Sequence, residues 1–217
     1  MPGYIEDALT RFKHARPRTP QDQPHPQVPP NYSATRQYAD QQDDPPLLEK
    51  AGKKVVQEVC GTLLYYARAV DCMMLAALGS ITTEHTSPTA NTMRNIKQLP
   101  DYAATHPDSV VTYRSSNIVL AAHSDASYLS ETKSRSRAGG HFFMASNISV
   151  PENNGAVHTA AQIIKTVMSS VAEEELGALY INSCEAISAP HLLEAMGHHQ
   201  PPNCNANQQL HRVGRLH

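Results

Sequence analysis

The 217-residue sequence lacks the features of secreted and membrane proteins. Its cysteines have no CxxC spacing and follow no signal sequence, so they predict reduced thiols inside a cell. They are Cys60, Cys72, Cys184 and Cys204. No run approaches the roughly eighteen apolar residues of a transmembrane helix. We therefore expect an intracellular protein, cytoplasmic or nuclear, that is not secreted and has no membrane partner.

An excess of positive charge is also missing, because the net charge is -2 and the predicted pI is near 6.6. The chain as a whole therefore does not resemble a nucleic-acid-binding protein in its charge. Locally, Lys133, Arg135 and Arg137 alternate in a segment that reads as extended, which would turn all three side chains to one side near Asp125. They predict contacts to backbone phosphates. A solvated hairpin tip explains the same pattern equally well.

Proline is unevenly distributed along the chain. Residues 15–46 hold eight of the sixteen prolines, among Gln, Asp, Asn and Thr. Such a composition buries too little apolar surface to offset the entropy of ordering the backbone. We expect residues 1–46 to form a disordered, proline-rich segment.

Residues 47–107 predict helices. Apolar residues recur at helical intervals until a break near Asp71. A second helix is expected over residues 89–104, with Pro88 near its N-terminus. Pro100 should weaken that helix in mid-course. The helices would pack as a hairpin ahead of a sheet.

Three apolar runs, over residues 116–122, 139–145 and 156–165, predict strands of an antiparallel sheet. After them, Ser170 and Glu173 fit a capping box, which predicts a helix over about 171–186. Its apolar stripe would include Leu176, Leu179 and Tyr180, and residues 191–196 would add a short helix. The fold class is α/β (α+β), with a three-stranded antiparallel sheet and a covering helix.

Two acids of this region are candidate metal ligands. Asp125 follows the first apolar run, and Glu175 lies beside the helix stripe, so we expect them to share a divalent cation. Glu173 and Glu174 are rival positions. His123 should lie on the same strand face as Asp125, and a structural hydrogen bond is its favoured role. A zinc site at His198, His199 and Cys204 is disfavoured, because four correctly spaced ligands are lacking.

The segments SDASYLSETKSRSRAGGHFFM, VMSSVAEEELGALYI and LLEAMGHHQPP occur in this order. They resemble the ribonuclease H domain in the polymerase polyprotein of copia-type retrotransposons. Residues 58–120 look like the segment that joins the reverse transcriptase thumb to that domain. The resemblance spans roughly residues 40–202, so residues 47–107 are expected to be thumb/connection-like and 108–200 to be a truncated ribonuclease H-like domain.

The resemblance carries the family's first catalytic aspartate to Asp125 and its helix glutamate to Glu175. In such enzymes, carboxylates hold two Mg²⁺ ions that activate water to cleave the RNA strand of an RNA–DNA hybrid. This sequence departs from the family because it has no acid after Glu194. We expect the third metal ligand to be missing and Mg²⁺ binding to be weak. Residues 201–217 are interpreted as an aberrant tail, with a frameshift near Asn203 as the hypothesis.

A reverse transcriptase palm is not expected either, since Asp43 and Asp44 lie in the polar, proline-blocked context QQDDPPLL. Three functions remain open. The chain is a ribonuclease H-like remnant without catalysis, which is the favoured interpretation. Alternatively, it is a working nuclease whose missing ligand comes from Glu194, Asp101 or another chain. The third possibility is a non-enzymatic module that binds nucleic acid or protein.

Overall fold

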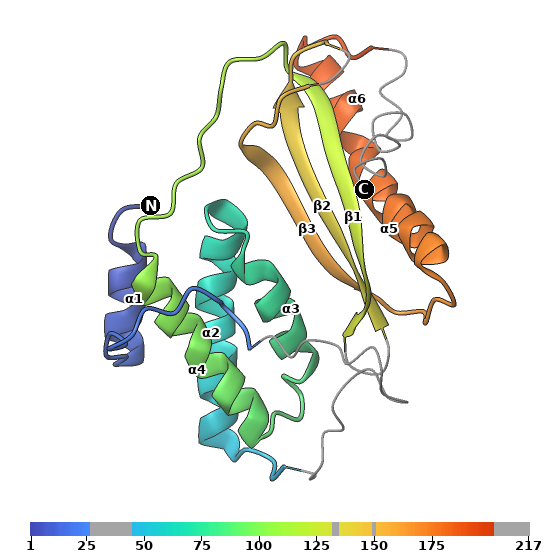
Figure 1. The fold of residues 1–217 in the computed structure, drawn as a ribbon. Helices are drawn as coiled ribbons and strands as arrows, with labels where there is room; N and C mark the ends of the chain where they lie inside the picture. The colour runs from blue at the N-terminus through green and yellow to red at the C-terminus, as the bar shows by residue number, and fades with distance from the viewer. Residues whose placement is uncertain (27–44, 132–134, 149–150, 202–217) are drawn as a thin grey trace. The chain divides into compact units, whose positions relative to one another are not determined.

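The computed structural model describes residues 1–26, 45–131, 135–148 and 151–201 (Figure 1). The chain divides into two compact units, Met1–Val110 and Val111–His217. The first unit is helical, and the second combines helices with a three-stranded antiparallel sheet, so the mixed α/β class is confirmed. Among the described residues, none of the helices has the length and apolar character needed to span a membrane.

The first unit contains four helices in its described part. They are α1 (Tyr4–Phe12), α2 (Lys50–Ala69), α3 (Met74–Thr83) and α4 (Ala90–Thr105). The expected break near Asp71 is present between α2 and α3. The core of the unit is formed by fully buried side chains, including Val56, Leu63 and Tyr66 of α2, Leu78 and Ile81 of α3, and Ile96 and Leu99 of α4.

The prediction of disorder over residues 1–46 is wrong at its N-terminal end. Helix α1 buries Ile5, Ala8 and Leu9, which recur at the three- and four-residue spacing of one helix face. Tyr4 stacks on Tyr66 at 5.7 Å between ring centroids, and its hydroxyl donates to the Thr62 carbonyl at 2.9 Å. The proline-rich composition that follows concealed this short amphipathic segment. Residues 27–44 lie outside the described part of the chain.

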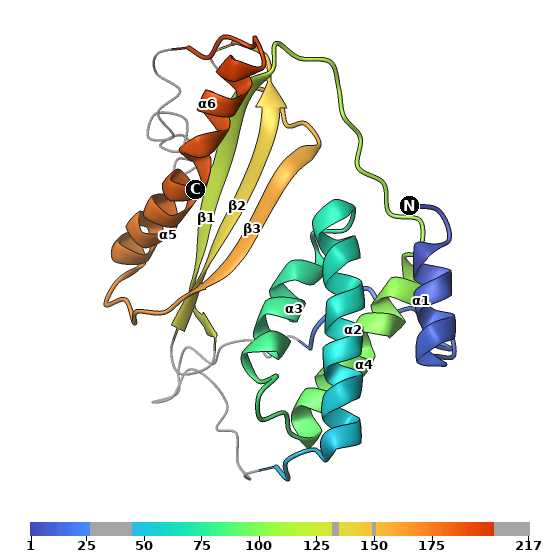
Figure 2. The same ribbon diagram turned by 180° about the vertical axis from the view of Figure 1, so that it is seen from behind.

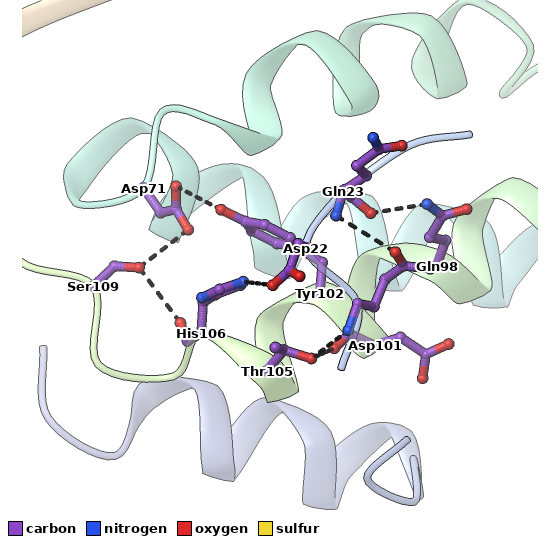
Figure 3. Close-up of polar contacts among 10 residues, drawn as sticks. Asp22, Gln23, Asp71, Gln98, Asp101, Tyr102, Thr105, His106 and Ser109 are labelled. Atoms are coloured by element: carbon purple, nitrogen blue, oxygen red, sulfur yellow. Dashed lines mark hydrogen bonds and ion pairs between the residues drawn. The ribbon is translucent and has the colours of Figure 1, made fainter. Parts of the chain in front are cut away.

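Residues 15–26 run extended along α4, as their prolines favour, but they are held in place. The Gln21 amide donates to Thr105 Oγ1 at 3.0 Å, and Gln98 Nε2 donates to the Gln23 carbonyl at 2.8 Å. Asp22 pairs with His106 at 3.0 Å (Figure 3). Extended backbone has free donors and acceptors, and here the side chains of α4 satisfy some of them.

Helix α4 starts as expected and passes through Pro100 without interruption. The Thr89 side chain accepts from the Thr92 amide, and the Thr92 hydroxyl accepts from the Thr89 amide. Pro100 is buried inside the helix. It removes one backbone donor, but the buried neighbours Leu99 and Tyr102 anchor the turn around it.

The second unit contains strands β1 (Val119–Glu131), β2 (Arg135–Ala145) and β3 (Ala156–Ile164), in the spatial order β1-β2-β3. The predicted antiparallel sheet is therefore confirmed. Strand β1 is longer than expected, because it continues beyond Ala122 through residues that alternate between half-buried and exposed over Ser124–Tyr128. Asp125 consequently lies within β1, paired with Gly139, and not at a strand end.

Helices α5 (Val171–Ala186) and α6 (Ser188–Ala195) lie along one face of the sheet (Figures 1 and 2). The start of α5 is confirmed, since Ser170 Oγ accepts from the Glu173 amide at 3.2 Å. The predicted apolar stripe is right only at Leu179, which packs against the cluster of Leu120 and Ala122, because Leu176 and Tyr180 are 65% and 70% exposed. Residues spaced by four face the sheet instead, namely Glu174, Ala178, Asn182 and Ala186. The small side chains of Ala178 and Ala186 allow a close approach of helix and sheet.

Candidate functional site

Side chains alternate between the two faces of β1, and this alternation decides where each candidate ligand points. Leu120 and Ala122 pack in one apolar cluster with Ala186 of α5. The Ser124 hydroxyl accepts from Asn182 Nδ2 of α5 at 2.7 Å, and Ala126 packs beside Ala178. The even-numbered residues of β1 therefore face α5.

Asp125 and His123 accordingly lie on the face of the sheet opposite α5. His123 pairs with His141 of β2, and the two rings stack at 6.4 Å between centroids. His123 Nε2 is 2.7 Å from Asn153 Oδ1, so the favoured structural hydrogen bond is present. The Asp125 side chain is exposed.

The three consecutive glutamates at the start of α5 have different environments. Glu173 is exposed, and its Oε2 accepts from both the amide and the hydroxyl of Ser169, which lowers its pKa. Glu174 is fully buried, and neither carboxylate oxygen has a hydrogen-bond partner among the described residues. Glu175, the preferred metal ligand from the sequence, is exposed.

Burial is the main cause that raises the pKa of Glu174. The Ser136 hydroxyl opposes this effect, and the charges of Glu175 and Asp125 add to it. The pKa of Glu175 is likewise raised, first by burial and then by Asp125. Asp125 lies on the edge strand β1, and its charge raises the pKa of both glutamates.

A Coulomb effect of Asp125 on the glutamates of α5 does not by itself show that the carboxylates coordinate one ion together. Mg²⁺ requires ligand oxygens at about 2.1 Å in octahedral geometry. Asp125 lies on the sheet face opposite α5, Glu175 is exposed on α5, and Glu174 is closed off from solvent. The described residues include no group of three His, Cys, Asp or Glu side chains suited to a metal ion. The described part of the chain therefore offers no three-ligand site of the kind that would hold Mg²⁺.

The three basic residues proposed for phosphate contacts do not form one common surface group in the described structure. Arg137 forms an ion pair with Glu131 at 2.6 Å, with side chains only 9% and 11% exposed, and donates to the Ala161 carbonyl at 3.0 Å. Its guanidinium is thus used within the sheet, which disfavours a phosphate contact. Arg135 opens β2 and pairs in register with Glu131. Lys133 lies outside the described residues.

The remaining alternatives for a metal ligand have their own positions. Asp101 lies on α4 and accepts from His14 Nε2 at 2.7 Å, so it belongs to the helical unit's own contacts. Glu194 is exposed on α6. His198 and His199 are described, whereas Cys204 lies outside the described residues, so the zinc arrangement stays untested.

Asn182 is a buried polar residue that the sequence did not single out. Its Nδ2 donates to Ser124 Oγ at 2.7 Å and to the Gly139 carbonyl at 2.8 Å, which ties α5 to β1 and β2. The available signal was its spacing of four from Ala178 and Ala186. A comparison of the chain with protein families, with curated proteins and with solved structures found no match.

Proposed function

We propose that residues 108–200 are a ribonuclease H-like module related to the polymerase polyprotein of copia-type retrotransposons, and that this module no longer cleaves RNA–DNA hybrids. The kinship rests on the motif resemblance. It is supported by the succession of three antiparallel strands and one covering helix, with an acid on the first strand and glutamates in the first turn of the helix. Residues 47–107 are proposed, by resemblance alone, as the thumb/connection-like segment.

The observation that carries the loss of cleavage is the placement of Asp125 on the sheet face opposite α5. Two-metal hydrolysis needs carboxylates that converge on two ions about 4 Å apart, so that both the attacking and the leaving oxygen are contacted. We infer from this placement that Asp125 and Glu175 do not converge in this way, and the buried Glu174 offers no open coordination position.

The direct test is cleavage of an RNA–DNA hybrid by the purified chain in Mg²⁺ or Mn²⁺. We expect no cleavage above that of a matched preparation of the Asp125→Asn variant. Hybrid cleavage that depends on Mg²⁺ and disappears in Asp125→Asn, but persists in Glu173→Gln, would establish a working nuclease. It would then favour the alternative in which the missing ligand comes from elsewhere.

A second candidate function is a non-enzymatic interaction module. Between its two suggested partners, the structure favours protein over nucleic acid, because Arg137 is paired internally while apolar side chains are exposed along α5 and α6. Binding to RNA–DNA hybrid, the ancestral partner implied by the resemblance, would decide for nucleic acid if it weakened steeply with salt.

A further inference from the structure

Strand β1 is an edge of the sheet, and part of that edge is already capped. Gln200 Oε1 accepts from the Leu120 amide at 3.1 Å, and Gln200 Nε2 donates to the Ile118 carbonyl at 2.9 Å. At the other end, the pairing of β1 with β2 becomes irregular after Ser127, and Leu129 has a left-handed φ of 50°. Among the described residues, the regular stretch of the edge without such a cap is therefore 121–127, and its midpoint is Ser124.

The contacts of Gln200 also show which backbone groups point outward. In an antiparallel strand, the N–H and C=O of one residue point to the same side, and successive residues alternate. Because Leu120 points to the outer edge, Ala122, Ser124 and Ala126 do so too. No hydrogen bond joins these outward groups to another residue in the described part of the chain.

We propose that this edge pairs with β1 of a second copy of the chain, antiparallel and centred on Ser124. In this register, Ser124 faces Ser124 of the second copy, and Ala122 faces its Ala126. All three are hydrogen-bonded positions, so the outward groups of both copies are satisfied together. The register leaves the Gln200 cap in place, because pairing stops before Leu120. This inference does not depend on the ribonuclease H kinship.

The side chains of the far face are self-complementary in the same register. His123 comes opposite Asp125 of the second copy, and Asp125 comes opposite its His123. These are non-hydrogen-bonded pairs, whose Cα atoms approach to about 4.5 Å, so their side chains interact most closely. A histidine and an aspartate placed symmetrically about Ser124 thus form two favourable pairs, whereas most other registers would not match them.

The helix layer is compatible with the same pairing. Helix α5 packs on both β1 and β2, and strands are spaced by about 4.8 Å, so the α5 helices of two copies would lie about 10 Å apart. This is the usual distance between packed helices. Leu179 packs against the cluster that contains Leu120 and Ala122 of β1. Leu176 lies three residues before Leu179 on the helix and is 65% exposed. Leu176 therefore borders the flank of α5 that would meet its symmetry mate.

The test is sedimentation equilibrium of the full chain over a range of concentrations, with four variants. His123→Glu places Glu opposite Asp125, and Asp125→Lys places Lys opposite His123. We expect each to weaken dimerisation by about tenfold or more. The double variant His123→Glu/Asp125→Lys restores opposite charges and should recover dimerisation to within about threefold of the unmodified chain. Val157→Glu, on the other edge strand β3, is the matched control and should have no effect.

Thermal melts of each variant distinguish lost pairing from lost folding, because a variant that only fails to pair still melts as a folded chain. The double variant must fold in order to dimerise. A chain that stays monomeric at all concentrations overturns the proposal. So does a dimer that survives both single variants, or one that Val157→Glu disrupts, since the interface would then lie elsewhere. Failure of the double variant to recover, while it melts like the unmodified chain, overturns the Ser124-centred register.

Discussion

Asn182 and Gly140 occupy positions that depend on each other. A Cβ atom added at Gly140 would lie 2.4 Å from Asn182 Oδ1 and 2.9 Å from the ring of Phe142. The absent side chain at Gly140 leaves room for the buried Asn182 amide that bonds Ser124 and Gly139. Gly140 thus lets α5 pack closely on the sheet.

Gly140→Ala should therefore destabilise the second unit by about 1–3 kcal/mol, the usual cost of overpacking a filled site. The neighbouring glycine is the matched control. A Cβ at Gly139 would meet only the Asp125 carbonyl oxygen, at an ordinary 3.7 Å. Gly139→Ala should be neutral or slightly stabilising, because alanine lowers the entropy of the unfolded chain. Equal urea midpoints for the two variants would contradict the close contact with Asn182.

Glu174 predicts an unusual dependence of stability on pH. Burial raises its pKa, so the native state holds the proton more tightly than the unfolded chain does. The resulting stabilisation is complete below the ordinary pKa of 4.5 and is lost as the pH rises through the raised pKa of the folded state. Glu174→Ala removes the buried carboxyl group and with it this loss of stability. The difference in unfolding free energy between the variant and the unmodified chain should therefore move in favour of the variant by about 1–3 kcal/mol from low pH to pH 7.

Glu173 is the control for that experiment, because its pKa is shifted in the opposite direction. Ser169 lowers it, so its contribution is present at neutral pH and is lost as the pH falls through the folded-state pKa. The difference between Glu173→Ala and the unmodified chain should shrink with acidification. If both variants showed the same slope in denaturation from pH 3 to 8, the buried position of Glu174 would be refuted.

Breaking the buried Arg137–Glu131 ion pair should cost more stability than breaking an exposed ion pair of similar length. Glu131→Gln leaves a largely buried guanidinium without its carboxylate, and we expect a loss of roughly 3 kcal/mol. Arg11 and Glu58 pair at 2.7 Å, but their side chains are 60% and 35% exposed. Glu58→Gln should cost less than about 1 kcal/mol. Chemical denaturation of both variants at low and high salt provides the comparison, and equal costs would contradict it.

Much of the second unit could be predicted from sequence because its signals are local. Turn formers separate the strands, and Ser170 caps α5 where it was expected. The site was harder, because it depends on which face of a strand each residue takes. Asp125 was expected at a strand end, where side-chain direction is loosely fixed. In fact β1 continues to Glu131, and the pleat assigns Asp125 to the face away from α5.

The orientation of α5 was missed for a related reason. An apolar periodicity predicts the buried face of a helix only when the helix has one apolar stripe. Helix α5 has apolar residues on two of its faces. Leu176 and Tyr180 outrank the small residues Ala178 and Ala186 in hydrophobicity, yet the small residues face the sheet. Close approach of backbones, and not side-chain hydrophobicity, decided the packing.

Asp71 lies in the connection between α2 and α3, and we expect its substitution to lower the stability of the helical unit. Its carboxylate is buried and accepts from Ser109 Oγ at 3.2 Å and from the Tyr102 hydroxyl at 3.5 Å (Figure 3). It also accepts from the Met73 amide at 3.2 Å. An asparagine at this position keeps one acceptor but turns an amide donor toward groups that also donate. Asp71→Asn should therefore destabilise the helical unit by about 1–3 kcal/mol.

The same substitution should change a second observable. The pKa of the Tyr102 phenol is raised by burial and, further, by the charge and hydrogen bond of Asp71. Removing the charge should lower that pKa toward its ordinary value, which an alkaline absorbance titration measures, with Tyr102→Phe identifying the signal. Ser109→Ala removes one donor and leaves the charge, so it should cost stability without lowering the pKa of Tyr102. A Tyr102 titration that Asp71→Asn leaves unchanged would show that the carboxylate does not act on the phenol.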